Sequence, residues 1–228
     1  MLEILFQDEY LIAINKPPGL IVHRSAIAAD AKEFALQMLR DQVGKIVHPV
    51  HRLDRKTSGV LLFAFDKGTL KSVASDFAEG RMIKKYLAIV RGYCIDEDTI
   101  DYALVSESGK SQEAITDYRT LAKVELEVPF GKHSTSRYSL VEATPKTGRM
   151  HQLRKHFAHI FHPIIGDRPH GCNKQNKLFK EKWRMKEMML HAHSLKFIHP
   201  IFKKEVVIKA ALHSEFKRMN ALMGFSVI

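Results

Sequence analysis

The stretch HRLDRKTSGVLLFAF at residues 51–65 decides the fold of this chain. Its second half, VLLFAF at 60–65, is a continuous apolar run of strand length, which predicts a strand buried on both faces. Its first half is a polar loop that carries Asp54 and ends in the turn sequence TSG. The stretch therefore predicts a buried strand with a charged loop, and a carboxylate, at its start.

Around this stretch, short strands are mixed with helices that do not alternate strictly with them. Ser214 is the expected N-cap of the last helix. This pattern predicts an α+β protein with a mostly antiparallel or mixed sheet, and it argues against a doubly wound parallel fold. The expected strands are residues 2–7, 10–15, 60–65, 86–90, 114–126, 136–144 and two within 193–210, and the expected helices are 31–43, 67–80, 147–161 and 215–223.

The charge of the chain is concentrated in its C-terminal part. The 228 residues carry a formal net charge of +11. Residues 131–228 hold 19 basic and 6 acidic residues, whereas residues 1–130 hold 17 basic and 19 acidic residues. This asymmetry predicts a polyanionic partner, with nucleic acid the first choice and a membrane surface the second.

Composition excludes several other classes of protein. No run of about 18 apolar residues occurs, which excludes a transmembrane helix. The first residues include acids and no basic region, so they do not form a secretory signal. Cys94 and Cys172 are the only cysteines. Two cysteines cannot build a disulfide framework or a zinc finger, and they suit a reducing cytoplasm.

Asp54 is the first candidate for chemistry. Arg52, Arg55 and Lys56 crowd around it in sequence. Nearby cations favour the ionised carboxylate, which can then act as a nucleophile or a base. The alternative is an Asx-type turn with a surface ion pair, and the local pattern leaves both interpretations open.

The second candidate segment is TGRMHQLRKHFAHIFHP at residues 147–163. With Leu153 and Phe157 facing the core, His151 and Arg154 are expected three apart on a different helix face. They can present donors to a carboxylate or a phosphate, and Arg149 can do the same near the helix start. The alternative is a basic helix that lies in water.

The same segment allows a metal hypothesis, but the pattern is weak. It contains no HExxH or CxxC motif, and no acidic residue occurs between Glu142 and Asp167. Zinc and iron sites commonly add a carboxylate or a fixed motif. The sequence therefore favours no metal site here. The histidines concerned are His151, His156, His159 and His162.

Two further segments suggest contact with RNA. Tyr86 follows basic residues in an expected strand, where it can stack on a base or serve as a core tyrosine. Residues 168–186 are rich in Lys and Arg and include Phe179 and Trp183. This segment suits a phosphate-tracking surface, or else a solvated helix with two aromatic anchors.

Together these segments resemble the motifs of the RluA-type pseudouridine synthases, in the right order over essentially the whole chain. The stretch between Leu104 and Ala114 is short against the family. The resemblance implies a long mixed, mostly antiparallel sheet, flanking helices and a central active-site cleft, in one catalytic domain over residues 1–228 without an N-terminal S4 domain. The matching motifs are NKPPG at 15–19, HRLDRKTSG at 51–59, KKYLAIVRG at 84–92, TGRMHQLRKH at 147–156, HPIIGDRPHG at 162–171 and MLHAHSL at 189–195.

The resemblance implies an isomerase that converts a uridine within RNA to pseudouridine, with no metal and no organic cofactor. His170, where many rRNA-modifying relatives have Tyr, favours tRNA, and the expected target is uridine 65 in the T stem. The alternatives are an rRNA enzyme of the same family and a non-catalytic RNA-binding protein. The expected protein is cytoplasmic and monomeric, with no membrane association and no obligate protein partner.

The resemblance also assigns roles to residues. Asp54 is the expected catalytic carboxylate, Arg154 pairs with it, and Tyr86 lies against the target base. Arg52 fills the space that the extruded nucleotide leaves. The other expected substrate-binding residues are His51, Thr57, Arg149, His151 and Leu190, and the expected RNA-binding surface is Arg168, Lys174, Lys177 and Lys180.

Overall fold

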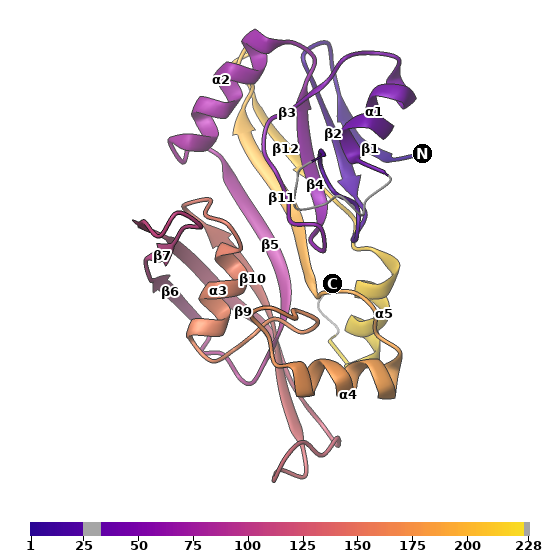
Figure 1. Ribbon diagram of the computed structural model, residues 1–228, viewed down its shortest axis with the longest axis vertical. Helices are drawn as coiled ribbons and strands as arrows, with labels where there is room; N and C mark the ends of the chain where they lie inside the picture. Colours follow the sequence, from indigo (N-terminus) through magenta and orange to yellow (C-terminus); the bar gives the residue numbers. More distant parts are fainter. Residues whose placement is uncertain (25–32, 226–228) are drawn as a thin grey trace. The chain divides into compact units, whose positions relative to one another are not determined.

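The computed structural model describes residues 1–24 and 33–225. The chain divides into two compact units (Figure 1). The first unit contains Met1–Lys84 and Ala192–Leu212, and the second contains Lys85–His191 and His213–Ile228. Each unit therefore combines segments that are far apart in the sequence.

The first unit is built on antiparallel strands. Strand β2 pairs with β1 and β4, β4 also pairs with β3, and β11 pairs with β12. The order is β1-β2-β4-β11, and α2 packs on β3 and β4. The elements are β1 (Glu3–Gln7), β2 (Leu11–Lys16), α1 (Ala35–Val43), β3 (His48–Pro49), β4 (Ser58–Ala64), α2 (Lys67–Ala78), β11 (Leu190–Ile198, which starts in the second unit) and β12 (Glu205–Lys209).

The core of the first unit forms around β4. All seven residues of this strand are buried, as the apolar run at 60–65 predicts. Leu62 packs in one cluster with Leu11 from β2, Val73 from α2 and Leu195 from β11. Burying each such side chain stabilises the fold by about 1.5–3 kcal/mol. The position of β4 between β2 and β11 fixes where the loop that precedes β4 ends.

The second unit also has antiparallel strands, in the order β5-β10-β9-β6, with β7 and β8 as a separate pair. Helix α3 packs on β10, as Figure 1 shows. Phe157 from this helix lies in a core cluster with Val90, Val141 and Ile164. The elements are β5 (Ile83–Arg91, which starts in the first unit), β6 (Glu97–Asp101), β7 (Leu104–Val105), β8 (Ser111–Gln112), β9 (Ile115–Leu126), β10 (Ser136–Pro145), α3 (Gln152–His159), α4 (Asn173–Trp183) and α5 (Ser214–Leu222).

The predicted α+β class is confirmed, and every strand pairing whose register is described is antiparallel. The strands expected from residues 2–15, 86–90, 114–126, 136–144 and 193–210 all form. The strands β3, β6, β7 and β8 were not predicted. Strands β3, β7 and β8 have two residues each, too few for a periodic pattern, and β6 has the largely polar sequence EDTID. The central cleft and the single catalytic domain over residues 1–228 stay predictions.

The helix predicted for residues 147–161 is shorter than expected. It begins at Gln152, because His151 adopts a left-handed conformation with φ 56°. Residues before it are therefore not on the helix, and Met150 is 40% exposed where helical spacing predicts core. At the other end, Ile160 packs on the core while Phe161 is 87% exposed.

Two other helix ends also differ from the prediction. Helix α1 begins at Ala35, and residues 31 and 32 of the predicted helix lie outside the described residues. Helix α5 begins at Ser214, with His213 as the N-cap, so Ser214 is not the capping residue. In the part of the chain that the structure describes, no helix has both the length and the apolar character needed to cross a membrane.

Candidate functional site

The Asp54 loop leads into β4 in the first unit. The backbone N–H of Thr57 donates to the carbonyl of Asp54 over 3.1 Å, which closes a tight turn. Leu53 is buried, whereas Arg52 is exposed and Asp54 half-buried. The buried side chains of Leu53 and Thr57 therefore anchor the turn, and the charged residues between them are half-buried or exposed.

Lys16, which sequence reasoning missed, lies fully buried beside this loop. Its Nζ donates to the carbonyls of Pro17 (3.0 Å), Leu20 (2.8 Å) and Arg55 (3.2 Å). Burial lowers the pKa of Lys16 to about 7, although the Asp54 carboxylate acts in the opposite direction. Lys16 therefore ties the residue after Asp54 to the NKPPG segment and places a cation near the carboxylate.

Gly59 fixes the path of the chain from the loop into β4. Its φ is 109°, a conformation that favours glycine, and an added Cβ would overlap the carbonyl oxygen of Ala192. The close approach of β4 to β11 at this point leaves no room for a side chain. The turn sequence TSG thus has its glycine where the backbone requires one.

His51, expected to bind substrate, contacts the protein itself. Its Nε2 accepts a hydrogen bond from the backbone N–H of Leu62 over 3.1 Å, and its ring stacks on Phe77 at 4.7 Å. Burial lowers the pKa of His51 to about 4, and the ammonium of Lys84 acts in the same direction. The imidazole is held neutral and fastens the start of the loop to β4.

This burial predicts a pH-dependent stability. Between pH 6.5 and 4 the unfolded chain takes up a proton at His51 that the folded chain does not accept. The free energy of unfolding therefore decreases as the pH is lowered through this range. The loss is about 2–3 kcal/mol and is absent above pH 6.5. Urea unfolding of wild type and His51→Gln measures it. The variant keeps an acceptor for Leu62 but does not titrate, so it should lose less stability on acidification; equal losses would contradict the assignment.

Arg154 forms a buried ion pair in the second unit. Its Nε donates to Oδ2 of Asp167 and its Nη2 to Oδ1, each over 2.8 Å. The side chains of Arg154 and Asp167 are 7% and 1% exposed. A bidentate pair of this kind fixes the plane of the guanidinium. Asp167, which was not predicted as a site residue, therefore orients Arg154.

The loop that carries Asp167 is itself held in place. Asn176 on α4 accepts from the backbone N–H of Gly166 (2.8 Å) and donates to the carbonyl of Asp167 (2.6 Å). Gly171 approaches the Asp167 backbone so closely that an added Cβ would overlap the Asp167 carbonyl oxygen. These contacts make Asp167 a rigid partner for Arg154.

His151 lies beside this pair, just before α3. Its Nδ1 is 3.0 Å from Nε2 of His170, and the two share a hydrogen bond. Burial lowers the pKa of His170, and the Arg154 charge acts in the same direction while the Asp167 carboxylate opposes it. His170, which was noted only as a difference from relatives, is thus the residue that contacts His151.

The other histidines of the metal hypothesis point to separate partners. Nε2 of His156 lies 3.1 Å from the carbonyl of Tyr102, and the ring of His159 stacks on Tyr102. Nδ1 of His162 lies 2.8 Å from the carbonyl of Arg91. Among residues 1–24 and 33–225, no group of three or more His, Cys, Asp or Glu side chains is arranged to hold a metal ion.

Tyr86 and Leu190 meet at the core of the second unit. Leu190 is buried in the cluster that contains Leu153 and Phe157 of α3, and Tyr86 packs against the same cluster while half-buried. This position keeps one part of the Tyr86 side chain accessible. It therefore allows both interpretations of Tyr86, as a core tyrosine and as a ring that stacks on a base.

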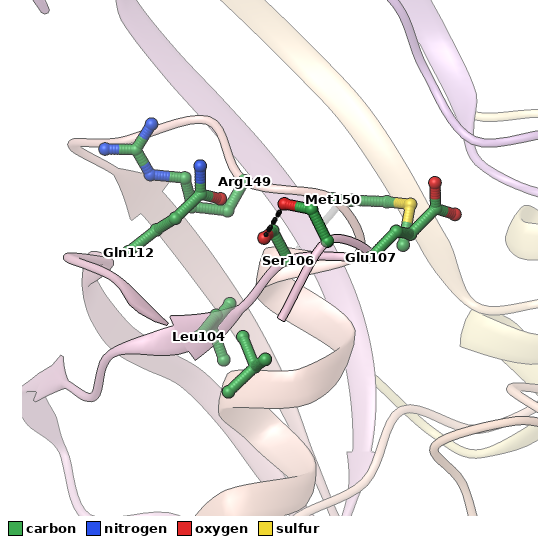
Figure 2. Close-up of a pocket in the computed structure, with 8 residues that line it drawn as sticks. Leu104, Ser106, Glu107, Gln112, Arg149 and Met150 are labelled. Carbon is green, nitrogen blue, oxygen red and sulfur yellow. Dashed lines mark hydrogen bonds between the residues drawn. The ribbon is translucent and has the colours of Figure 1, made fainter. Parts of the chain in front are cut away.

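The basic candidates lie on the surface of the second unit. Arg149 is exposed, and Figure 2 shows it at the edge of a pocket formed with the β7–β8 hairpin. On α4, Phe179 is fully buried and Trp183 half-buried, so the lysines occupy the opposite face. The exposed basic residues are Arg168, Lys174, Lys177 and Lys180.

The structure brings the predicted residues together in two groups. His51, Arg52, Asp54 and Thr57 share one loop of the first unit. The remaining candidates belong to the second unit, and the pairing of Arg154 with Asp54 stays a prediction. The sequence offered one signal for each missed residue. Lys16 directly follows the largely apolar run LIAIN at 11–15, and Asp167 is the lone acid of a long basic stretch.

Comparisons with known proteins show which family this chain belongs to. The sequence model described as RNA pseudouridylate synthase matches residues 10–159. Proteins named tRNA pseudouridine synthase C are 47% identical in Vibrio parahaemolyticus, over 96% of this chain and 93% of that protein, and 44% identical in Haemophilus influenzae, over 99% of both.

A solved structure has the same fold. Human RNA Pseudouridylate Synthase Domain Containing 4 superposes with a TM-score of 0.74 at 27% identity, covering 97% of this chain and 92% of that one. The family model covers more than half of the chain, and the relatives cover nearly all of it. On these grounds the chain belongs to the RNA pseudouridylate synthases, the family that its motifs HRLDRKTSG, KKYLAIVRG and TGRMHQLRKH predict.

Proposed function

We propose that this protein is a tRNA pseudouridine synthase that isomerises uridine 65 in the T stem. The observation that carries the proposal is the 44–47% identity, over nearly the whole chain, to proteins named tRNA pseudouridine synthase C. We further propose that it acts as a monomer in the cytoplasm and without an added cofactor. Its two cysteines, both free thiols, support a reducing compartment.

In this proposal Asp54 is the catalytic carboxylate. The reaction breaks the bond between N1 of the uracil and C1′ of the ribose, turns the uracil and joins its C5 to C1′. The proton lost from C5 is balanced by the proton that N1 gains. Asp54 is suited to this work because Lys16 and Thr57 hold its loop in one conformation. A pre-positioned anion acts on the substrate with little reorganisation.

Arg154 is assigned as the partner of Asp54. Its pair with Asp167 uses Nε and Nη2 of the guanidinium, and we assign the same guanidinium to the Asp54 carboxylate. Asp167 then acts as a positioning residue, because it orients the guanidinium through two buried hydrogen bonds. Tyr86 is assigned to the face of the target base.

The target uridine must leave its helix to react. A base in a stem cannot be reached in place, and extruding it costs a few kcal/mol. Arg52 is assigned to fill the vacated space, which its exposed side chain permits. The basic surface on α4 then holds phosphates, while the residues assigned to the reaction select the base.

The experiment that tests the target site uses purified protein and unmodified RNA. Each tRNA transcript and rRNA fragment is incubated without added cofactor, and pseudouridine is mapped at nucleotide resolution. We expect one new pseudouridine, at position 65 of tRNA. Modification only at other tRNA positions, or only in rRNA, would contradict the proposed target while leaving the family assignment intact.

The α4 surface gives a separate prediction about affinity. Reversing Lys174, Lys177 and Lys180 to Glu removes cations that the proposal places against phosphates. We expect the dissociation constant for tRNA to rise at least about tenfold near 0.1 M salt, and its salt dependence to flatten by up to about three released counterions. Binding assays over a salt series measure both.

The control reverses Lys67 and Lys71, which are exposed on α2 of the first unit. The control should affect affinity less per charge removed. If the two variants weaken binding equally per charge, α4 is not a specific RNA-docking surface.

A further inference from the structure

A pocket of about 340 Å³ lies between the β7–β8 hairpin and the loop before α3. Leu104 to Ser108 and Gln112 form one wall, and Arg149 and Met150 form the other (Figure 2). The volume suits a ligand about as large as one nucleotide. All of these residues belong to the second unit, and none has a role in the proposed reaction beyond the substrate contact expected of Arg149.

Arg149 supplies a cation at one end of the pocket. Its Nε donates to the carbonyl of Glu113 over 2.9 Å, and its backbone N–H donates to Oε1 of Gln152 over 2.9 Å. These contacts fix the base of the side chain, and Figure 2 shows the guanidinium projecting away from Met150. The terminal nitrogens are therefore placed to pair with a phosphate.

Apolar groups form a different part of the pocket. Met150 is 40% exposed and Val105 is 59% exposed, whereas Leu104, which also lines the pocket, is 4% exposed. Exposed apolar side chains gathered in a hollow mark a binding surface, and a methionine thioether makes favourable contacts with aromatic rings. This part of the pocket can hold the face of a nucleobase.

The hairpin wall adds polar groups in a defined arrangement. Oγ of Ser106 accepts a hydrogen bond from the backbone N–H of Lys110 (3.1 Å) and shares another with Oγ of Ser108 (3.0 Å). The carboxylate of Glu107 lies near Met150 in Figure 2. Lys155 on α3 donates to the carbonyl of Val105 over 3.4 Å, which ties the hairpin to the helix that carries Arg154. The wall is thus part of the folded unit.

We propose that this pocket binds one unpaired nucleotide of the RNA substrate, apart from the target uridine. Arg149 pairs with its phosphate, Met150 and Val105 contact the face of its base, and Glu107 accepts from an exocyclic amino group. Adenine, cytosine and guanine carry such an amino group and uracil does not, so the proposed contact makes the base A, C or G. The inference rests on the proposed function, since it takes RNA as the substrate.

The test measures tRNA binding and the footprint of the protein on tRNA at nucleotide resolution. Arg149→Ala and Met150→Ala are each expected to raise the dissociation constant about three- to tenfold. Both variants should lose protection of the same nucleotide. Glu107→Gln should weaken binding only when that nucleotide carries an amino group. Lys110→Ala, a change in the same hairpin outside the pocket lining, should retain the protection.

Dissociation constants within twofold of wild type, with an unchanged footprint, would overturn the pocket assignment. Pseudouridine formation measured on the same samples separates this failure from failure of the proposed function. If uridine is converted to pseudouridine and the pocket variants leave the footprint unchanged, only the pocket assignment is refuted. A pocket-dependent footprint without any conversion refutes only the proposed reaction, and no binding of tRNA by wild type refutes both.

Discussion

Asp167→Ala is expected to destabilise the second unit by about 3–5 kcal/mol, because it leaves the Arg154 guanidinium buried without its bidentate partner. Urea unfolding followed by Trp183 fluorescence measures this loss. Trp183 is the only tryptophan of the chain and packs edge-on against Phe179 in the same unit. The change is large because both charged groups are almost completely removed from water.

A double-mutant cycle separates the pair from its surroundings. Arg154→Met combined with Asp167→Leu removes both charges, so it should cost less than the sum of the single changes. Glu205→Ala is the matched control, because the Lys196–Glu205 pair is about half exposed and should contribute less than about 1 kcal/mol. If the double variant lost as much free energy of unfolding as the two single variants together, Arg154 and Asp167 would stabilise the fold independently of each other.

Activity tests whether Asp167 has a positioning role as well as a structural one. Asp167→Asn keeps one acceptor and the size of the side chain, so it should fold better than Asp167→Ala. We expect its turnover number to fall while its affinity for tRNA is unchanged, because the guanidinium loses its fixed plane. Equal turnover in folded Asp167→Asn and wild type would limit Asp167 to a structural role.

Asp54→Asn is expected to abolish pseudouridine formation, with a loss of about 10³-fold or more, since it removes the carboxylate assigned to the reaction. The fold should survive, because asparagine has the same size as aspartate and the turn keeps the bond from the Thr57 N–H to the backbone carbonyl at position 54. Single-turnover conversion of tRNA measures the effect, and circular dichroism checks the fold.

The control for this change is Asp41→Asn. Asp41 is an exposed acid on α1 of the same unit, and its side chain accepts a hydrogen bond from the amide of Gln37. It should convert tRNA at the wild-type rate. Near-normal conversion by Asp54→Asn would remove Asp54 from the mechanism, although the chain would still be a pseudouridine synthase.

Most of the fold could be predicted because its main strands are long and apolar. The run at 60–65 indicates a strand buried on both faces, and β4 has every residue buried. The short strands β7 and β8 have two residues each, too few for any periodic pattern. Helix α3 starts late because His151 takes a left-handed conformation, which helical spacing does not reveal.

The site was predictable where its residues are contiguous and less so where they meet through packing. Asp54 and its neighbours lie in one loop, so their proximity follows from the chain itself. Asp167 contacts Arg154 from 13 positions away, across a turn whose path depends on Gly166 and Gly171. Lys16 resembles a surface lysine in sequence, yet three backbone carbonyls allow its burial.

The central claim is that this chain makes pseudouridine in tRNA through Asp54. Its most direct test is pseudouridine mapping of total tRNA and rRNA from three kinds of cell. These are cells from which the protein has been removed, the same cells supplied with the wild-type chain, and the same cells supplied with the Asp54→Asn chain. The account predicts that a tRNA pseudouridine disappears without the protein and returns only with the wild-type chain. Unchanged pseudouridine in tRNA after loss of the protein, or equal restoration by Asp54→Asn, would contradict it.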